Sequence, residues 1–288
     1  MKVSGFTFIR NAILYDYPIV ESIKSILALC DEVVVAVGDS QDDTLQIIKS
    51  IDSDKIRIIE TKWDLSLRQG GQVLAVETNK ALSEVSSDAD WCFYIQGDEV
   101  IHEKYHSIIR EAMKHYKDQL NVEALLFKYL HFYGSYDFVG DSRKWYRNEI
   151  RIIRNGINAQ SYKDAQGFRI DDRKLKVKEI DAYVYHYGWV KPPEKQSEKI
   201  KNFLYHWHSD DYIDENKPKQ SFDYSQIDSL ERFKGSHPEV MKKRISQKNW
   251  QFDFNPTRKN FGFKTKLLYF FEKWTGIRIG EYKNYKKI

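Results

Sequence analysis

The sequence predicts an α/β protein in which a mostly parallel sheet is flanked by helices. Over residues 1–120, short apolar runs alternate with segments of helical periodicity, the pattern of parallel strands joined by helical crossovers. The runs, such as Val33–Val37, are apolar at every position, as in strands that helices cover on both faces. A chain of 288 residues with 41% hydrophobic residues is long enough to bury a sizeable core.

The first half contains four predicted strands, each followed by a predicted helix. The strands are Val3–Ile9, Val33–Val37, Ile56–Glu60 and Trp91–Gln96. The helices begin near Pro18 and at Asp42, and span Gly70–Val85 and His102–Tyr116. The acids at 42 and 43 suit a helix start, because negative side chains interact favourably with the positive end of the helix dipole.

The second half has a different pattern. The predicted strands Ala124–Phe132, Glu149–Arg154 and Tyr183–Trp189 are separated by polar loops, which indicates a mixed or antiparallel addition to the first sheet. Ser197–His208 is a predicted helix, and Ser209–Gln220 a predicted flexible loop. We therefore expect one domain over 1–191, with a half at 1–120 and a half at 121–191, followed by a helical C-terminal extension over 192–288.

Positive charge gathers in the C-terminal extension. Residues 241–288 carry thirteen Lys or Arg and three acids, a net charge of +10, whereas the whole chain has a net charge of +4. The segment Lys264–Trp274 is amphipathic, with Leu267, Phe270 and Trp274 on its apolar face. This pattern predicts attachment of residues 264–288 to an anionic membrane surface, with a solvated basic surface as the alternative. Nucleic-acid binding is not expected, because no recognised module accompanies the basic residues.

Cysteine usage and hydropathy bear on the compartment. Cys30 and Cys92 lie in apolar contexts without metal-ligand spacing, which predicts buried thiols in a reducing environment. The sequence shows no basic-then-apolar signal pattern and no run of 18 apolar residues. We expect a cytoplasmic protein, held peripherally at the inner face of the membrane if its tail attaches there.

Polar residues follow three of the predicted parallel strands where each ends. Arg10-Asn11 follows the first strand, Gly38-Asp39-Ser40 the second, and Gln96-Gly97-Asp98-Glu99 the fourth. Ligands of open α/β sheets bind at the carboxyl ends of the strands, so convergence there favours a site over three unrelated turns. The guanidinium suits a phosphate, Asp39 suits a base or ribose, and Asp98 suits Mg²⁺ or Mn²⁺.

These three blocks resemble family 2 glycosyltransferases of the GT-A fold. The resemblance rests on Phe8–Asn11, Val33–Thr44 and Tyr94–Glu99, covers the first half well and continues loosely to Trp189. It implies a GT-A fold and an inverting enzyme that moves a sugar from a nucleotide-diphosphate sugar to a glycan or lipid-linked acceptor of the cell envelope. The donor class that it implies is a UDP- or GDP-sugar.

The resemblance also implies a divalent metal, Mn²⁺ or Mg²⁺. The family carries an Asp-x-Asp motif after the fourth strand, but Gln96 stands at the first position here. Asp98 is then the carboxylate ligand, and His186 the implied second ligand. Without the resemblance, a lone His between two Tyr is more often a core residue than a metal ligand.

The remaining site predictions concern the base, the donor and the acceptor. Asp164 is the predicted catalytic base, with Asp137, Asp141 and Asp171 as alternatives. The predicted donor contacts are Arg10, Asn11, Asp39, Arg68, Gln72, Gln96, Gly97 and Asp98. Trp145 and Trp189 are predicted to stack on the acceptor, although filling the core is the commoner use of Trp.

Two other functions remain as alternatives from the sequence. A sugar-nucleotidyltransferase also needs acids and a metal near a phosphate site, but the glycine-rich basic loop typical of that class is missing after the first strand. A non-catalytic nucleotide-sugar-binding protein is the alternative that Gln96 suggests, because an amide brings no charge to a metal.

Overall fold

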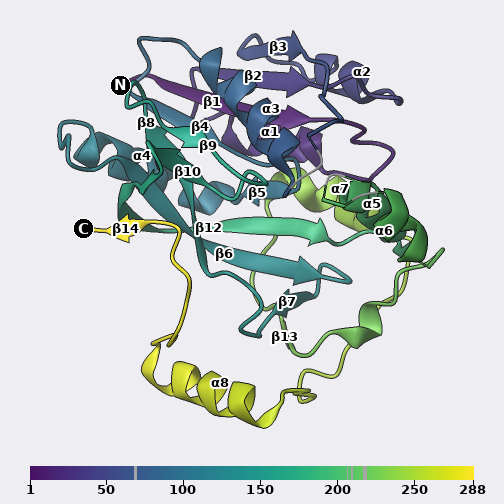
Figure 1. The fold of residues 1–288 in the computed structure, drawn as a ribbon. Coiled ribbons are helices and arrows are strands. Elements are labelled where there is room, and N and C mark those ends of the chain that lie inside the picture. Colours follow the sequence, from purple (N-terminus) through teal and green to yellow (C-terminus); the bar gives the residue numbers. More distant parts are fainter. Residues whose placement is uncertain (68–69, 206, 209, 217–218) are drawn as a thin grey trace.

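Four parallel strands organise the N-terminal half of the computed structural model, which describes residues 1–67, 70–205, 207–208, 210–216 and 219–288. They lie in the order β3-β2-β1-β4 within the large sheet (Figure 1). Their bounds are Ile56–Glu60 for β3, Glu32–Val37 for β2, Val3–Ile9 for β1 and Trp91–Tyr94 for β4. The helices between and after them are α1 (Ile19–Ile26), α2 (Thr44–Lys49), α3 (Gln72–Ser83) and α4 (His106–Tyr116).

The second half extends the sheet with strands of both directions. β8 (Asn148–Arg154) lies antiparallel between β4 and β6 (Ala124–Tyr133). β12 (Lys176–Trp189) pairs parallel with β6 and antiparallel with β5 (Glu99–Ile101), and β7 (Phe138–Gly140) lies beyond β6. A small separate sheet contains β9 (Gln160–Ser161), β10 (Phe168–Ile170) and β11 (Arg173–Lys174). The predicted α/β class, parallel first and mixed later, is confirmed.

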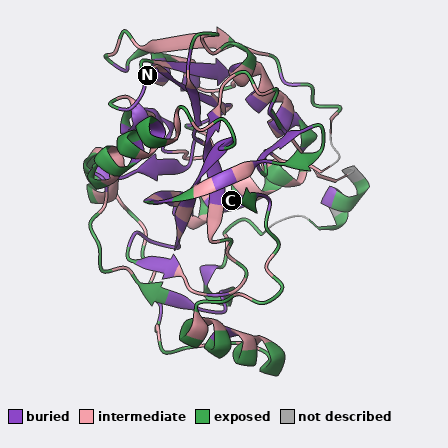
Figure 2. Cartoon of the chain, turned by 90° about the vertical axis from the view of Figure 1, so that its left-hand side faces the viewer, coloured by how far each residue is buried: buried purple, intermediate pink, exposed green. Residues whose placement is uncertain are grey.

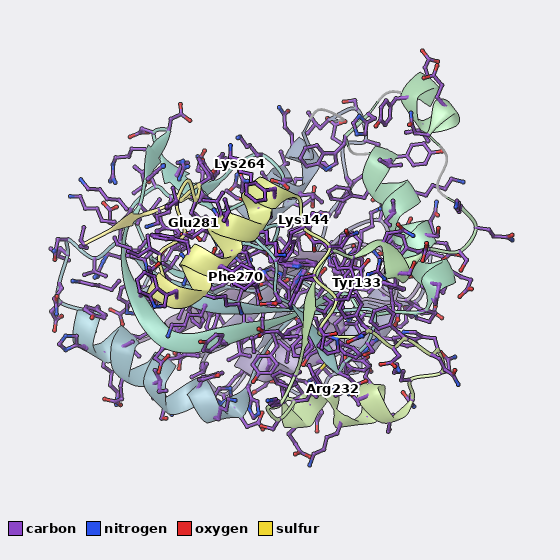
Figure 3. The ribbon with its side chains drawn as sticks, turned by 90° about the horizontal axis from the view of Figure 1, so that it is seen from below. Tyr133, Lys144, Arg232, Lys264, Phe270 and Glu281 are labelled. Atoms are coloured by element: carbon purple, nitrogen blue, oxygen red, sulfur yellow. The ribbon has the colours of Figure 1, made fainter. Side chains whose placement is uncertain are left out.

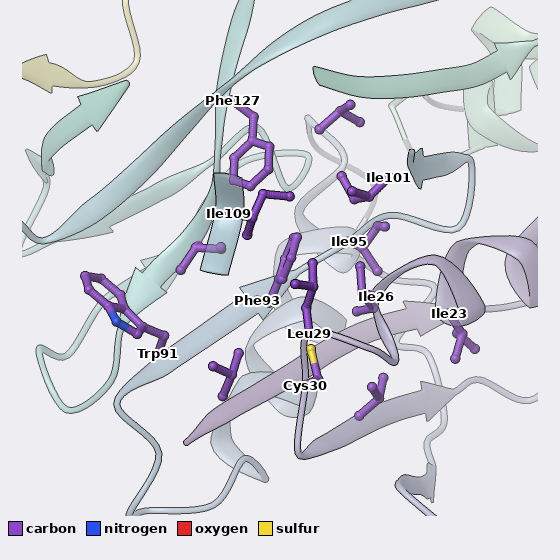
Figure 4. Packing of buried hydrophobic residues seen from close by; sticks show 14 of the residues in the cluster. Ile23, Ile26, Leu29, Cys30, Trp91, Phe93, Ile95, Ile101, Ile109 and Phe127 are labelled. Atoms are coloured by element: carbon purple, nitrogen blue, oxygen red, sulfur yellow. The ribbon is translucent and has the colours of Figure 1, made fainter. Parts of the chain in front are cut away.

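Apolar side chains fill the space on both faces of the sheet, as the continuous apolar runs predict. On one face, α1 and α4 pack against β1 and β4, with Ile23, Ile109 and Phe93 fully buried (Figure 4). On the other face, Ala81 of α3 packs with a second cluster. Figure 2 shows the buried strands at the centre of the molecule. The thiols of Cys30 and Cys92 are both free and buried.

The C-terminal extension differs from the helical segment that the sequence predicts. Its helices are α5 (Pro193–Tyr205), α6 (Asp210–Glu215), α7 (Lys242–Ser246) and α8 (Phe263–Thr275). However, β13 (Leu230–Arg232) pairs with β7, and β14 (Lys286–Lys287) pairs with β12. Short 3₁₀ turns lie at Glu103–Tyr105, Tyr224–Gln226 and Glu239–Met241. Residues 192–288 are therefore tied to the sheet by two strands too short to leave a sequence pattern, and a domain boundary at 191 stays a prediction.

Two predictions about this extension can be compared with the structure. The predicted loop 209–220 contains α6, a helix without apolar periodicity whose one buried described side chain is Ile213. Among the described residues, no helix has the length and apolar character needed to cross a bilayer. The predicted helix at 264–274 is confirmed as α8, which lies apart from the parallel strands (Figure 1).

Candidate active site

A cavity of about 850 Å³ opens at the carboxyl ends of β1 and β4. Its wall includes side chains from the loops after these strands, from β8 and β12, from α5 and from the segment after α8. The sequence-predicted residues that line it are Arg10, Asn11, Gln96, Gly97, Asp98, Trp145, Asp164, His186 and Trp189. The topology thus brings together residues that are far apart in the sequence, such as Arg10 and Trp189, which are separated by 179 positions.

Two of the predicted donor contacts, Asp39 and Gln72, do not line this cavity. Asp39 lies in a neighbouring hollow formed by the loop after β2. Gln72 is exposed on the first turn of α3. Arg68 lies outside the residues that the structure describes. The predicted donor contacts therefore form one cluster with Asp39 at its border, and Gln72 is not part of it.

Arg10 and Asp39 contact each other directly at the ends of β1 and β2. The Arg10 Nε atom lies 3.1 Å from Asp39 Oδ1, and the guanidinium lies 5.7 Å from the centre of the Trp63 ring. The indole also occupies the space beside Gly38, because a Cβ added there would collide with it. Trp63 therefore fills the space that the missing side chain of Gly38 leaves open. Arg10 and Asp39 instead present a charged pair beside an aromatic wall.

Asn11 joins the loops after β1 and β2. Its backbone is left-handed (φ 54°), a conformation that Asn tolerates better than most residues. Its Oδ1 accepts from the Gln41 backbone N–H at 2.7 Å, and its own N–H donates to Ser40 Oγ at 3.0 Å. The side chain is buried and committed to these contacts, so it shapes the edge of the cavity.

Asp98 lies at the bottom of the cavity, in the tight turn between β4 and β5. Its Oδ2 is 3.1 Å from Lys199 Nζ and 3.7 Å from His186 Nε2. Burial raises the pKa of the carboxyl, but the neighbouring Lys199 ammonium outweighs that effect, so its pKa lies well below the ordinary value. Asp98 is therefore ionised at neutral pH and already paired with a cation.

Glu99, next in the chain, points into the core. Arg151 donates to both of its oxygens, at 2.6 and 2.7 Å, and Tyr129 Oη donates to Oε1 at 2.7 Å. The carboxylate of Glu99 and the guanidinium of Arg151 are almost fully buried. All contacts of Glu99 are thus internal, and it offers no oxygen to a ligand of the cavity.

Gly188 of β12 leaves room beside its backbone for the Asp98 carboxylate and the His186 ring. A Cβ added to Gly188 would lie 2.7 Å from Asp98 Oδ2 and 2.8 Å from His186 Nε2, closer than real Cβ contacts allow. The register between β12 and β5 pairs His186 with Glu99, which places its ring beside Asp98. This arrangement of the site therefore requires a glycine between Tyr187 and Trp189, because a larger residue would collide with Asp98 and His186.

The residues around Asp98 do not fit a divalent cation. The amide of Gln96 replaces one carboxylate, and Glu99 is committed to Arg151. Lys199 contacts Asp98 Oδ2, the same oxygen that His186 Nε2 faces. Within the described ranges, no group of three His, Cys, Asp or Glu side chains is arranged to hold a metal. Because hard cations prefer several oxygen ligands, Asp98 and His186 alone make a poor site.

Of the four acids considered as the base, Asp164 alone lines the cavity. Asp141 is paired with Lys259 and Lys273, Asp137 accepts from Ser135, and Asp171 is exposed at the turn between β10 and β11. Burial raises the pKa of Asp164, which favours proton uptake from a hydroxyl.

Glu149 was not predicted from the sequence, yet it also lines the cavity. Burial raises its pKa to about 8, so it carries a proton at neutral pH. Its Oε2 is buried without a hydrogen-bond partner among the described residues. In the sequence, Glu149 is a polar position at the start of the predicted strand Glu149–Arg154. Its burial depends on tertiary packing, which the local sequence pattern does not show.

Trp145 and Trp189 meet at one side of the cavity, with ring centres 6.5 Å apart and planes at 81°. Trp145 stacks on His131 and Trp189 on Tyr133, with ring centres 5.1 and 5.8 Å apart. Each indole is partly buried and partly exposed to the cavity. The pair therefore combines core packing with an aromatic surface of the kind that sugars contact.

The segment after α8, which we call the tail strap (residues 276–285), forms another part of the wall. Arg147 pairs with Glu281 at 2.8 Å, and Arg278 donates to the Trp145 carbonyl at 2.6 Å. Glu272 of α8 accepts from Arg143 at 2.6 Å. Ion pairs and hydrogen bonds thus hold the strap as part of the cavity wall, a role that the sequence did not reveal.

Comparisons with known proteins give no family assignment, since no family model and no curated protein matches. Staphylococcus aureus TarS is 19% identical with a TM-score of 0.40, over 70% of this chain and 39% of that chain. TarS 1–349 in complex with UDP is 18% identical with a TM-score of 0.39, over 72% of this chain and 65% of that chain.

Two further structures belong to other enzymes. The 4-diphosphocytidyl-2C-methyl-D-erythritol synthase of Anaerococcus prevotii is 13% identical, with a TM-score of 0.42 over 70% of this chain and 94% of that chain. Mycobacterium tuberculosis glucosyl-3-phosphoglycerate synthase with Mn²⁺, UDP and phosphoglyceric acid has a TM-score of 0.30 at 18% identity, over 45% of this chain and 43% of that chain. This chain therefore spans less than two thirds of TarS, of TarS 1–349 and of glucosyl-3-phosphoglycerate synthase. TM-scores below 0.5 carry no functional argument, so the site itself must support any function.

Proposed function

We propose that this protein is a glycosyltransferase that moves a sugar from a UDP- or GDP-sugar to a glycan or lipid-linked acceptor, with inversion. The observation that carries the proposal is the convergence of side chains from two parallel strand ends, β8, β12 and α5 on one cavity at the carboxyl edge of the sheet. The motif resemblance of the three strand ends supports the same class.

The proposed roles follow from position in the cavity. Arg10, with Asp39 and Trp63 at one side, binds the nucleotide, and Lys199 faces the diphosphate. Trp145 and Trp189 contact the acceptor at the other side. Asp164 takes the proton of the acceptor hydroxyl as its oxygen attacks C1 of the donor sugar, and the nucleoside diphosphate leaves from the opposite face. Because the residues do not fit a divalent cation, no step is assigned to one.

The test is a panel of UDP-, GDP-, CMP- and dTDP-sugars, scored by thermal shift and by release of nucleoside diphosphate. A ligand present at 100 times its dissociation constant stabilises the folded protein by about 2.7 kcal/mol. Release of nucleoside diphosphate distinguishes a transferase from a nucleotidyltransferase, which releases pyrophosphate. A shift without turnover for any donor and acceptor would indicate the binding protein instead, and no shift at all would count against the proposal.

We further propose that α8 attaches to an anionic lipid surface. Its outward residues Phe263, Leu267, Phe270 and Trp274 repeat at helical spacing and are 56–87% exposed. The opposite face is anchored through polar groups, with Tyr269 donating to Asp141 and Glu272 accepting from Arg143. Figure 3 shows the molecule from the side of α8, with Lys264 and Phe270 labelled. A helix that turns its apolar stripe outward and is flanked by exposed lysines matches the interface of an acidic membrane.

A further inference from the structure

Lys199 projects from α5 into the cavity at the position beside Asp98. Its Nζ donates to Asp98 Oδ2 at 3.1 Å and to the Gly188 carbonyl at 2.9 Å. These contacts use two of the three N–H groups of the ammonium. Since Lys199 also lines the cavity, a third N–H is left for a ligand oxygen.

The second neighbour, His186, presents a lone pair to the same place. The Tyr146 carbonyl can only accept, so His131 Nε2, which lies 2.8 Å from it, carries a proton and donates. Burial lowers the pKa of both imidazoles, which are therefore neutral, and His131 Nδ1 is an acceptor. His186 Nδ1, 3.2 Å away, donates to it, and its Nε2 is left unprotonated toward Asp98.

Asp98 and His186 thus form an electron-rich pair that needs a cation, and Lys199 supplies one from within the chain. The ammonium also lies 4.9 Å from the centre of the Tyr17 ring, a further contact that favours positive charge. Burial lowers the pKa of Lys199, but Tyr17 and Asp98 outweigh that effect and the net shift is upward. The group therefore remains charged at neutral pH.

From this geometry we infer that the Lys199 ammonium does the work of a divalent cation, so that the site binds the diphosphate of its donor without metal. The inference rests on the proposed function. In the transfer step, the C1–O bond to the β-phosphate breaks and its electron pair stays on the phosphate oxygen. Lys199 stabilises this charge through hydrogen bonding without giving up a proton, while the hydroxyl proton passes to Asp164. The fixed position of Asp98 makes it a positioning residue for Lys199.

The experiment is calorimetric titration of the full chain with UDP and with GDP, in EDTA and again in MnCl₂. Wild type is expected to bind one of them in EDTA with an affinity within about twofold of that in Mn²⁺. Lys199→Met should lower the affinity in EDTA at least tenfold, and Lys199→Arg should restore part of it. Lys201→Met, an exposed lysine on the same helix, should bind like wild type.

The outcomes separate the inference from the proposed function. Binding in EDTA that is lost in Lys199→Met, but kept in Lys201→Met, supports both. Binding that requires Mn²⁺, or that persists in Lys199→Met without metal, overturns the inference and leaves the proposed function standing. No binding of either nucleotide in any condition overturns the proposed function and the inference with it. Melting temperatures without ligand establish that each variant is folded.

Titration with Mn²⁺ alone provides an independent measurement. With Lys199 in place, wild type is expected to show no saturable binding of Mn²⁺ at millimolar concentration. Lys199→Ala removes the ammonium and leaves Asp98 and His186 open to a metal, so this variant should gain only the weak affinity that two ligands provide. Tight Mn²⁺ binding by wild type that does not change in the variant would contradict the inference.

Discussion

Arg151 and Glu99 form a two-pronged ion pair inside the sheet, with N–O distances of 2.6 and 2.7 Å. Arg151 also lines the cavity, and its guanidinium lies 5.2 Å from the centre of the Tyr94 ring and 5.4 Å from that of Tyr129. The two adjacent acids after β4 therefore have different roles, because Glu99 is paired inside the core while Asp98 faces the cavity.

Removing the cation of this pair should be costly. Arg151→Met leaves the Glu99 carboxylate buried without its partner, and the expected loss in unfolding free energy is about 3–5 kcal/mol. Chemical denaturation measures it. The matched control is Arg57→Met, because Arg57 forms a half-exposed pair with Glu84 and should cost less than about 1 kcal/mol. Equal losses for the two variants would contradict a structural role for the buried pair.

Asp164→Asn tests the assignment of the base. The change keeps the shape of the side chain but removes its ability to accept a proton, so kcat should fall by about 10²–10⁴ with donor affinity unchanged. Steady-state kinetics and nucleotide titration report the two effects separately. Asp171→Asn, at the exposed turn beyond β10, should keep full activity. A loss of activity at Asp171 alone would reassign the base.

Gly188→Ala tests the close packing at Asp98. The added methyl group meets Asp98 Oδ2 and the His186 ring, so either the strand or these side chains must move. We expect a loss of about 1–3 kcal/mol in unfolding free energy and weaker nucleotide binding. Gly262→Ala is the control, because its added Cβ meets nothing within 4 Å and its φ of −63° suits alanine. Unchanged nucleotide affinity in Gly188→Ala would show that the site tolerates displacement of Asp98.

Glu149 should make stability depend on pH. Its folded pKa of about 8 lies above the ordinary value of 4.5. Below pH 4.5 both states hold the proton. As the pH rises toward 8, the unfolded chain ionises while the folded chain does not, so stability falls. Glu149→Gln should therefore exceed wild type in unfolding free energy by a margin that grows between pH 5 and 8 to about 2–4 kcal/mol.

Denaturation of both proteins across this range measures the margin. Glu111→Gln, at an exposed site on α4, controls for a general effect of losing one carboxylate. A margin that stays constant with pH would show that Glu149 ionises normally in the folded protein.

The membrane proposal predicts that binding depends on the outward face of α8. Flotation with phosphatidylglycerol vesicles should recover wild type, and the double change Phe270→Ser with Trp274→Ser should abolish recovery, because both side chains are more than half exposed. Leu120→Ser alters an apolar side chain that is 77% exposed on another surface and should leave binding intact. Binding to neutral phosphatidylcholine vesicles alone should be weaker, and recovery of the double variant would refute the proposal.

The parallel half of the fold could be predicted from sequence because burial on both faces leaves an uninterrupted apolar run. Val3–Ile9 and Ile56–Glu60 coincide with β1 and β3, and the polar residues after β1 and β4 meet in the cavity as the topology requires. The strand ends carry this information because the chain must become polar where it leaves the sheet. The pattern does not tell which of these polar residues face a ligand. Glu99 and Asn11 both follow strands, yet their side chains bind other parts of the protein.

Lys199 and Glu149 could not be predicted in the same way. Lys199 lies in a helix with two other lysines, and only the path of α5 back across the strand ends brings it to Asp98. The tail strap is fixed to the sheet by β14, which follows it and has only two residues. A strand of that length is too short to show periodicity in the sequence. These contacts depend on tertiary geometry between segments about 100 residues apart, which local pattern does not encode.

The way the tail strap is fastened makes it the part of the cavity wall that should open most easily. The Arg147–Glu281 ion pair and the two residues of β14 hold it, its one buried aromatic side chain is Tyr285, and the preceding α8 buries only Tyr269. A segment with so few buried apolar contacts opens at a lower free energy than the sheet beneath it. Its amide protons should therefore exchange with solvent well before those of β1 and β4, and under the proposed function such opening would give a long acceptor chain a route to the cavity without loosening the core.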